Sequence, residues 1–356
     1  MRSMTPPTLS VLLIPSRLIA SIFVAMAAVW AGLALCYRLP GGRAVKLPCV
    51  VAWTAFCLAT VIALWLGVGA VALPAFGLVF AMLLLWWIRV RPSNAHDWSD
   101  DVAQIAHGTV DGNRVTLHNV RNFDWRTTAD YTQRWETRDY DLDRLTTVDM
   151  IMSYWAGPAI AHMLISFGFD RGSQDEGSHV VFSVEIRRER SQAFSEIGGF
   201  FKEFELSIIA ADERDVVRLR TNVRGEEVYL YRLQLPRPAI RSLFLAYIGE
   251  ANRLVDSPRF YNTITVNCTT MVYHMMRRIV GRLPFSYRLL FSGYLPEYVY
   301  RVGGLDRRFT LTELRDRGRI AERAKQADCS TSFSADIRRG LPGDDIAADI
   351  VADVAK

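Results

Sequence analysis

The chain has 356 residues, half of them hydrophobic, and a formal net charge of +5. The charge is unevenly distributed, because residues 1–91 contain seven Lys or Arg and no Asp or Glu. Subtracting these seven from the 42 Lys and Arg leaves 35 in the remainder, against 37 acidic residues. The basic balance therefore belongs to the N-terminal segment, and it gives no ground for a nucleic-acid-binding function.

Residues 1–91 are predicted to form a multi-pass membrane anchor. The apolar run LIASIFVAMAAVWAGLALC is long enough to cross a hydrocarbon core of ~30 Å. A longer uncharged run follows, and it allows two crossings with a break in LGVGAVALP, where Gly and Pro occur. Because two more spans follow the first, the segment is not read as a cleaved signal peptide. The expected spans are about 18–36, 47–66 and 71–88.

Basic residues in the loops bear on the orientation of this anchor. Arg38, Arg43 and Lys46 lie in the first loop, whereas the second loop carries no charge. Since Lys and Arg favour the cytoplasmic side, this count places the first loop and the C-terminal domain in the cytoplasm.

The remainder of the chain is predicted to be an α+β domain with a mostly antiparallel sheet. Two apolar runs separated by DRGSQDEGS indicate a hairpin with a long loop centred near Gln174. Further strands are expected around it, and a helix with apolar residues at helical spacing follows Pro236. The predicted elements are strands over 112–125, 162–169, 179–186, 204–213, 215–222 and 226–235, and helices over 237–256 and from about 268.

Domain boundaries follow from these patterns. Residues 92–134 are expected to form a linker and an N-terminal strand region, and 135–325 the folded domain. The segment 326–356 is rich in Asp, Ala, Ser and Gly, which predicts a disordered tail.

Cys268 lies in RFYNTITVNCTT, after an extended apolar stretch and at the start of a predicted helix. Asn267 is a good N-cap, which places Cys268 at the first helical position. There the helix N-terminus favours the thiolate, and its free N–H groups can hold an oxyanion. Two other interpretations remain open: a buried small hydrophobic side chain, or a disulfide with Cys329.

A thiol nucleophile also needs a base, and six histidines are candidates. His274 lies six residues from Cys268, about 240° around the helix, so it faces away. His162 and His179 each open a strand of the hairpin. The remaining three lack the close partners of a metal site, so neither metal nor cofactor is expected; they are His96, His107 and His118.

Five segments between about residues 135 and 320 resemble the Lnb N-terminal periplasmic domain family: AHMLISFGF, SVEIRRE, ADERDVVRLRTN, EEVYLYRL and RFYNTITVNCTT. The resemblance implies a papain-like, NlpC-type thiol-enzyme fold in permuted order, with His before Cys. It implies Cys268 as nucleophile, His162 as base and Glu185 as the residue that orients the imidazole. It also implies a periplasmic domain on a bacterial inner membrane, against the Lys and Arg count.

The hairpin register supports this choice of histidine. With the loop centred near Gln174, facing residues should have numbers that sum to about 348, within about two. Glu185 then comes within reach of the His162 ring. His179 instead faces Phe169 beside the acidic loop, a setting that suits a solvated residue.

Three functions are compatible with these residues. The first is a thiol acyltransferase or acyl hydrolase acting on phospholipid or lipoprotein acyl groups, with membrane lipids and lipoproteins as partners. The second is an NlpC-type cysteine peptidase or amidase acting on cell-wall peptides, and the third is a non-enzymatic, membrane-anchored binding module. In the first two, Asn267, Thr269 and Tyr261 are expected to contact the substrate. The oligomeric state is left open.

Overall fold

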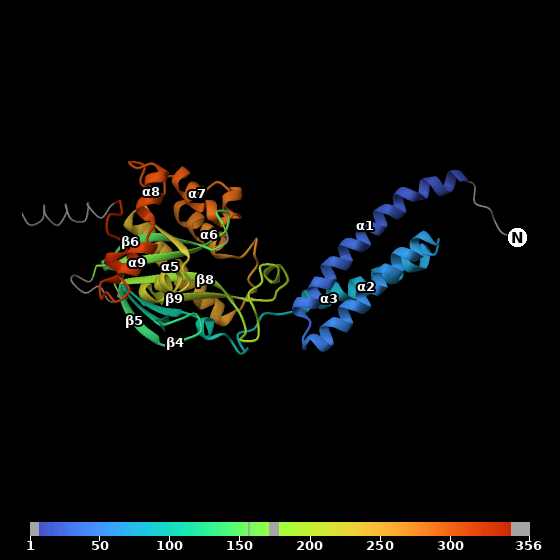
Figure 1. Cartoon of the computed structure of the whole chain (residues 1–356), viewed down its shortest axis with the longest axis horizontal. Helices are drawn as coiled ribbons and strands as arrows, with labels where there is room; N and C mark the ends of the chain where they lie inside the picture. Colours follow the sequence, from blue (N-terminus) through green and yellow to red (C-terminus); the bar gives the residue numbers. More distant parts are fainter. Residues whose placement is uncertain (1–6, 156, 171–177, 343–356) are drawn as a thin grey trace, which may run out of the picture. The chain divides into compact units, whose positions relative to one another are not determined.

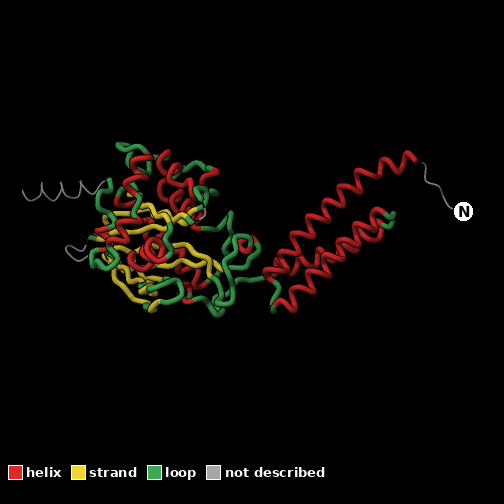
Figure 2. Tube along the Cα trace, viewed as in Figure 1, coloured by secondary structure: helices red, strands yellow, loops and turns green. Residues whose placement is uncertain are grey.

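The computed structural model describes residues 7–155, 157–170 and 178–342, and the chain divides into two compact units (Figures 1 and 2). The first unit comprises Met1–Pro92 together with Ser195–Glu203. The second comprises Ser93–Phe194 and Phe204–Lys356.

The first unit contains three apolar helices, α1, α2 and α3 (Figure 1). Each is long and apolar enough to cross a membrane, over Ile14–Arg38, Arg43–Trp65 and Gly69–Arg89, which confirms the three predicted spans. Stacked aromatic rings fill the space between them, with the Trp53 and Phe76 centroids 5.8 Å apart. The helix bounds are Pro7–Arg38 for α1, Arg43–Trp65 for α2 and Gly69–Arg89 for α3.

The segment Ser195–Glu203 packs with these helices, although it lies far along the chain. The Phe201 ring stacks on Tyr37 at the end of α1, with centroids 5.9 Å apart. Lys202 Nζ donates a hydrogen bond of 2.7 Å to the Trp87 carbonyl and lies 4.7 Å from the Trp87 ring centroid. The anchor unit therefore extends beyond residues 1–91.

The second unit is built on an eight-stranded sheet in the order β1-β2-β9-β8-β7-β6-β10, with β5 pairing β2. Every pairing is antiparallel except that of β2 with β9, which confirms the predicted mostly antiparallel α+β domain. The strands are β1 His107–Asp111, β2 Arg114–Arg121, β5 Trp135–Asp141, β6 Leu145–Tyr154, β7 Ala161–Phe169, β8 His179–Arg187, β9 Glu205–Asp212 and β10 Glu227–Arg232. A separate small hairpin pairs β3 Asp124–Trp125 with β4 Tyr131–Thr132.

Helices cover both faces of the sheet, and alternating side chains of each strand pack against them (Figure 2). On β7, Met163, Ile165 and Phe167 point toward α5 and α6 in one core. Leu164 points to the other core, which includes residues of α4, α9 and α10. The helices are α4 Glu213–Arg218, α5 Arg237–Asp256, α6 Cys268–Val280, α7 Leu295–Arg301, α8 Leu311–Gly318, α9 Ala321–Gln326 and α10 Phe333–Asp336.

Three expectations differ from the structure. The strands expected in 92–134 are present, but the boundary expected at residue 135 is absent, because β1 and β2 form part of the main sheet. The run 215–222 is helical and not a strand: Asp212 caps α4 by accepting a hydrogen bond from the Arg214 N–H, and a π-helical turn follows at Leu219–Val223 (η4). Its Val216 and Val217 are buried against the sheet.

The C-terminal segment is also more ordered than expected, since α10 and the residues up to 342 pack on the sheet. Arg338 is 4 % exposed and holds two buried carboxylates. Its Nε donates to Asp149 at 3.0 Å, and its Nη1 and Nη2 donate to Glu213 at 2.7 and 2.6 Å. This network ties the C-terminal segment to β6 and α4. The rest of the predicted tail, 343–356, lies outside the described residues.

Candidate functional site

The hairpin of β7 and β8 positions the first part of the site. Its ladder runs from Leu164 opposite Ser183 to Gly168 opposite His179, so facing numbers sum to 347. This confirms the predicted register to within one residue, although its centre, Gln174, lies outside the described residues. The ladder stops at Leu164, so His162 and the Met163 N–H lie beyond the last paired residues, toward Glu185.

The N-terminus of α6 positions the second part. Asn267 caps this helix, and its Oδ1 accepts hydrogen bonds from the Thr269 and Thr270 N–H groups at 3.0 and 2.9 Å. The Thr270 hydroxyl accepts from the Asn267 N–H in return, which completes a capping box. Cys268 is thereby fixed at the first helical position and is 8 % exposed.

The His162 ring is held through its Nε2 atom. Nε2 lies 2.7 Å from Ser183 Oγ and 3.0 Å from Glu185 Oε1. Because an ionised carboxylate only accepts hydrogen bonds, Nε2 carries the proton, and Nδ1 is left for the thiol. Ser183 Oγ itself donates to Glu185 at 2.6 Å, and Arg220 Nη2 donates to the same carboxylate oxygen at 3.3 Å.

The charges of these side chains favour a thiolate–imidazolium pair. Burial acts against the charged form of His162, but the Glu185 carboxylate outweighs it and raises the His162 pKa to about 9. Burial likewise opposes ionisation of Cys268, but His162 and the Met163 N–H hold the thiol pKa below its ordinary value. The pKa of Glu185 is held far below its usual range despite burial, chiefly by His162. The proton that Cys268 and His162 share therefore resides on the imidazole.

The backbone around Cys268 limits where an oxyanion can bind. The N–H groups of Thr269 and Thr270 are occupied by Asn267, so the expectation that the helix start offers several free donors is wrong. Among the described residues, the Cys268 N–H has no acceptor and is the donor that remains. Burial, and next the Cys268 thiol, raise the pKa of Tyr261 well above the ordinary value, so its hydroxyl stays protonated.

A cavity of about 330 Å³ opens onto His162 and Glu185. Trp155 and Phe194 contribute exposed aromatic rings to its lining. Its charged lining includes Arg188, Arg220, Arg224 and Glu226. A substrate can thus approach the imidazole from solvent through a space with both aromatic and charged walls.

The structure assigns different positions to the other expected residues. Asn267 uses its side chain for capping, since its Nδ2 also donates to the Thr263 carbonyl at 2.7 Å, so a role in substrate binding is not supported. Thr269 Oγ1 lies 3.9 Å from Cys268 Sγ. Cys268 and Cys329 are both free thiols, so the alternative of a disulfide between them is not realised.

His179 lies at the other end of the hairpin from His162. Its Nδ1 is 2.9 Å from Ser178 Oγ, and its ring packs against Gly168. Burial, and next the Arg338 charge, lower its pKa to about 4. It is therefore a partly buried, neutral residue of the Arg338 network, and the expectation of a solvated side chain is wrong.

The other histidines form no metal centre. The rings of His107 and His118 stack with centroids 4.9 Å apart. Within the described ranges, no group of three or more His, Cys, Asp or Glu side chains is placed to hold a metal ion.

Three contributors to the site were not predicted from the sequence. Ser183 could have been found, because it lies two residues before Glu185 and so shares its face of β8. The Met163 N–H contacts the thiol and not β8, because the β7–β8 ladder stops at Leu164. Arg220 reaches Glu185 from the π-helical turn η4, in a segment that was predicted to be a strand.

Comparison with known families supports the predicted resemblance. Residues 131–293 match the family described as the Lnb N-terminal periplasmic domain. The match includes β5 to β10, α5 and α6, and thus every side chain of the site. No curated protein and no solved structure matches the chain.

Proposed function

We propose, on the premise that the domain following the anchor belongs to the Lnb N-terminal periplasmic domain family, that this chain is a thiol acyltransferase or acyl hydrolase. The chain is a membrane protein with three membrane-capable helices and a periplasmic domain, against the Lys and Arg count. The proposal adds that the membrane is the bacterial inner membrane and that the fold is papain-like. The substrate is an acyl group of a phospholipid or lipoprotein.

The first half of the proposed reaction acylates Cys268. The thiolate attacks the carbonyl carbon of an ester, and the oxyanion accepts hydrogen bonds from the Cys268 N–H and the Tyr261 hydroxyl. When the intermediate collapses, the C–O bond breaks and the His162 imidazolium gives its Nδ1 proton to the departing alcohol oxygen. The products are a thioester on Cys268 and an alcohol, which for a phospholipid donor is a lysophospholipid.

The second half resolves the thioester. An amine or water attacks the same carbonyl carbon, and neutral His162 accepts the proton that the nucleophile loses. The C–S bond breaks and the thiolate returns beside the imidazolium. Glu185 remains ionised throughout and stabilises the charged ring, as the acidic member of a triad does.

One observation carries the proposal: a buried thiol at a capped helix N-terminus interacts with an imidazole whose other nitrogen is held by a carboxylate. A purely structural cysteine needs neither an orienting carboxylate nor a lowered pKa. The three helices of the anchor add a reason for a lipid substrate, since they retain the enzyme at its donor.

The test compares wild-type and Cys268→Ala protein in lipid nanodiscs containing phosphatidylethanolamine and a synthetic lipopeptide with a free N-terminus. Mass spectrometry of both pools should show lysophospholipid from the wild type alone, with N-acylated peptide if the enzyme is a transferase. Unchanged lipids together with cleavage of added cell-wall peptides would favour the peptidase or amidase alternative. No product of either kind would favour a binding module.

A further inference from the structure

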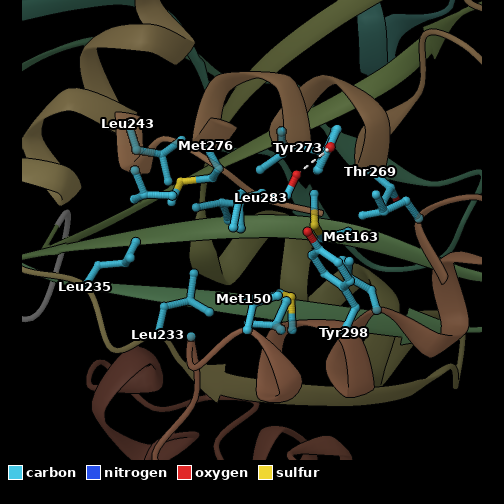
Figure 3. Close-up of a pocket in the computed structure, with 18 of the residues that line it drawn as sticks. Met150, Met163, Leu233, Leu235, Leu243, Thr269, Tyr273, Met276, Leu283 and Tyr298 are labelled. Atoms are coloured by element: carbon cyan, nitrogen blue, oxygen red, sulfur yellow. Dashed lines mark hydrogen bonds between the residues drawn. The ribbon is translucent and has the colours of Figure 1, made fainter. Parts of the chain in front are cut away.

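An apolar cavity of about 200 Å³ lies between α6 and the sheet, next to the proposed nucleophile (Figure 3). Met150 and Met163 line it from the sheet, and Met276 lines it from α6. Figure 3 shows Thr269 at one end of the group and Leu235 at the opposite end. A void of this size with apolar walls suits an apolar ligand, because such a cavity gives water too few polar partners.

The hydroxyl groups of the two tyrosines in the wall are hydrogen-bonded to backbone carbonyls. The Tyr273 hydroxyl donates to the Leu283 carbonyl at 3.0 Å, the bond drawn in Figure 3. The Tyr298 hydroxyl donates to the Pro284 carbonyl at 2.8 Å. Both tyrosines therefore present ring carbon to the cavity, and a ligand gains by burying hydrocarbon there.

The wall formed by α6 leads away from the thiol. Val272, Met276 and Val280 follow Cys268 at intervals of four residues, so they lie along one face of the helix. From Thr269 to Val280 the helix rises about 17 Å, which is roughly half of a ~30 Å hydrocarbon core and hence close to the length of one lipid acyl chain. Met163, whose N–H contacts the thiol, lines the same cavity.

The segment 281–291 covers the cavity and exposes several apolar side chains on its outer surface. Leu283 and Leu289 line the cavity from this segment. Its exposed side chains include Phe285, at 67 %, and Phe291, at 51 %. Clustered exposed apolar residues mark a surface that meets lipid or another apolar partner. The segment 281–291 therefore presents apolar side chains both to the cavity and to the outside.

We propose that this cavity, which we call the α6 cavity, binds the fatty acyl chain of the donor and of the Cys268 thioester. The inference rests on the proposed function and adds the site of the chain. The chain runs from the thiol along the face formed by Val272, Met276 and Val280. The donor is a lipid, because the lining is apolar except for Gln234, Thr269 and the hydrogen-bonded tyrosines, and so offers few groups for the polar backbone of a cell-wall peptide. The length of the cavity then limits the length of the acyl chain transferred.

Photocrosslinking tests chain binding without any chemistry at the thiol. Full-length Cys268→Ala protein is placed in nanodiscs that contain phosphatidylethanolamine with a diazirine on one acyl chain. After irradiation, labelled peptides are identified by mass spectrometry. Peptides from α6 and from 281–291 should be labelled, together with those of α1 to α3, which contact bulk lipid and serve as the internal reference.

Two matched variants decide whether the label reports the α6 cavity. Met276→Trp, made in the Cys268→Ala background, fills the middle of the cavity. It should lower labelling of 281–291 roughly tenfold relative to α1–α3, because methylenes beyond the block lose their burial. Arg277→Trp places the same side chain on the exposed face of α6 and should change nothing. Val280→Trp, at a partly exposed position, repeats the test if Met276→Trp is unstable.

Chain length gives a second readout in protein with Cys268 intact. With a donor mixture of short and long acyl chains, Met276→Trp should shift the thioester on Cys268 toward short chains, and Arg277→Trp should not. Unlabelled α6 peptides, or labelling that Met276→Trp and Val280→Trp leave unchanged, would overturn the inference even if Cys268 is acylated. Labelling that Met276→Trp abolishes, without acylation of wild-type Cys268, would keep the chain site and reject the proposed function.

Discussion

Replacing Glu185 with Gln should make the Cys268 thiol behave like an ordinary one. In the structure, the Glu185 carboxylate accepts the Nε2–H of His162 at 3.0 Å and raises the His162 pKa from 6.5 to about 9. The amide of Gln keeps the shape but removes the charge. Burial and the neighbouring Arg220 both lower the His162 pKa, so in the variant it should fall below 6.5.

The size of the expected change in thiol reactivity follows from the shift in the His162 pKa. A rise from 6.5 to about 9 corresponds to about 3 kcal/mol in favour of the imidazolium. Part of this free energy lowers the thiol pKa, because an imidazolium stabilises a neighbouring thiolate. Losing it should move the pH at which half of the thiol is ionised upward by about one to two units. At a pH of about 6 the variant should therefore alkylate at least roughly tenfold more slowly than the wild type.

The assay follows iodoacetamide labelling of the Cys268 peptide by mass spectrometry as a function of pH, since the chain has four other cysteines. Wild-type labelling should persist as the pH falls well below ~8.5, the pKa of a free cysteine. Glu227→Gln is the matched control, because Glu227 pairs with Arg319 on the surface. Equal profiles for wild type and Glu185→Gln would refute the account of how the thiol is activated.

Three other variants test separate parts of the account. Tyr261→Phe removes one oxyanion donor and should slow acylation of Cys268 roughly 10²-fold while leaving its alkylation unchanged; equal losses in both assays would show a structural role instead. His162→Ala should abolish acylation as Cys268→Ala does, with no further loss in the double variant, whereas His179→Ala should keep activity; the reverse outcome would mean that the base is misassigned. Arg338→Ala leaves two buried carboxylates without their cation and should lower the free energy of unfolding by about 3–5 kcal/mol, and a change in urea denaturation below about 1 kcal/mol would contradict this.

Local rules were sufficient to predict the core of the site. The cap residue Asn267 and the extended stretch before it predicted that Cys268 begins a helix, and the structure begins α6 there. The alternation of β7 and β8 and the length of their loop predicted that Glu185 lies beside His162. Both predictions use contacts within one helix turn or one hairpin, whose geometry depends on few residues.

Contacts between distant segments could not be predicted in this way. Arg220 reaches Glu185 from the helical run 215–222, whose valines and leucine favoured a strand. The polar composition of the C-terminal segment gave no sign that Arg338 forms a buried ion pair. Its partner Asp149 lies 189 residues away in the sequence. Likewise, nothing near Phe201 in the sequence indicates that its ring stacks on Tyr37. Tertiary burial decides such segments, and their own propensities do not.

The most direct test of the central claim is to isolate the acyl-enzyme. Wild-type protein in nanodiscs of one defined phosphatidylethanolamine, without an amine acceptor, is quenched in acid, and the peptide containing Cys268 is weighed. The account predicts a mass increase equal to one acyl group of that lipid, lost on treatment with neutral hydroxylamine and absent in Cys268→Ala and His162→Ala. An unmodified Cys268 peptide, obtained under conditions in which lysophospholipid accumulates, would contradict the account.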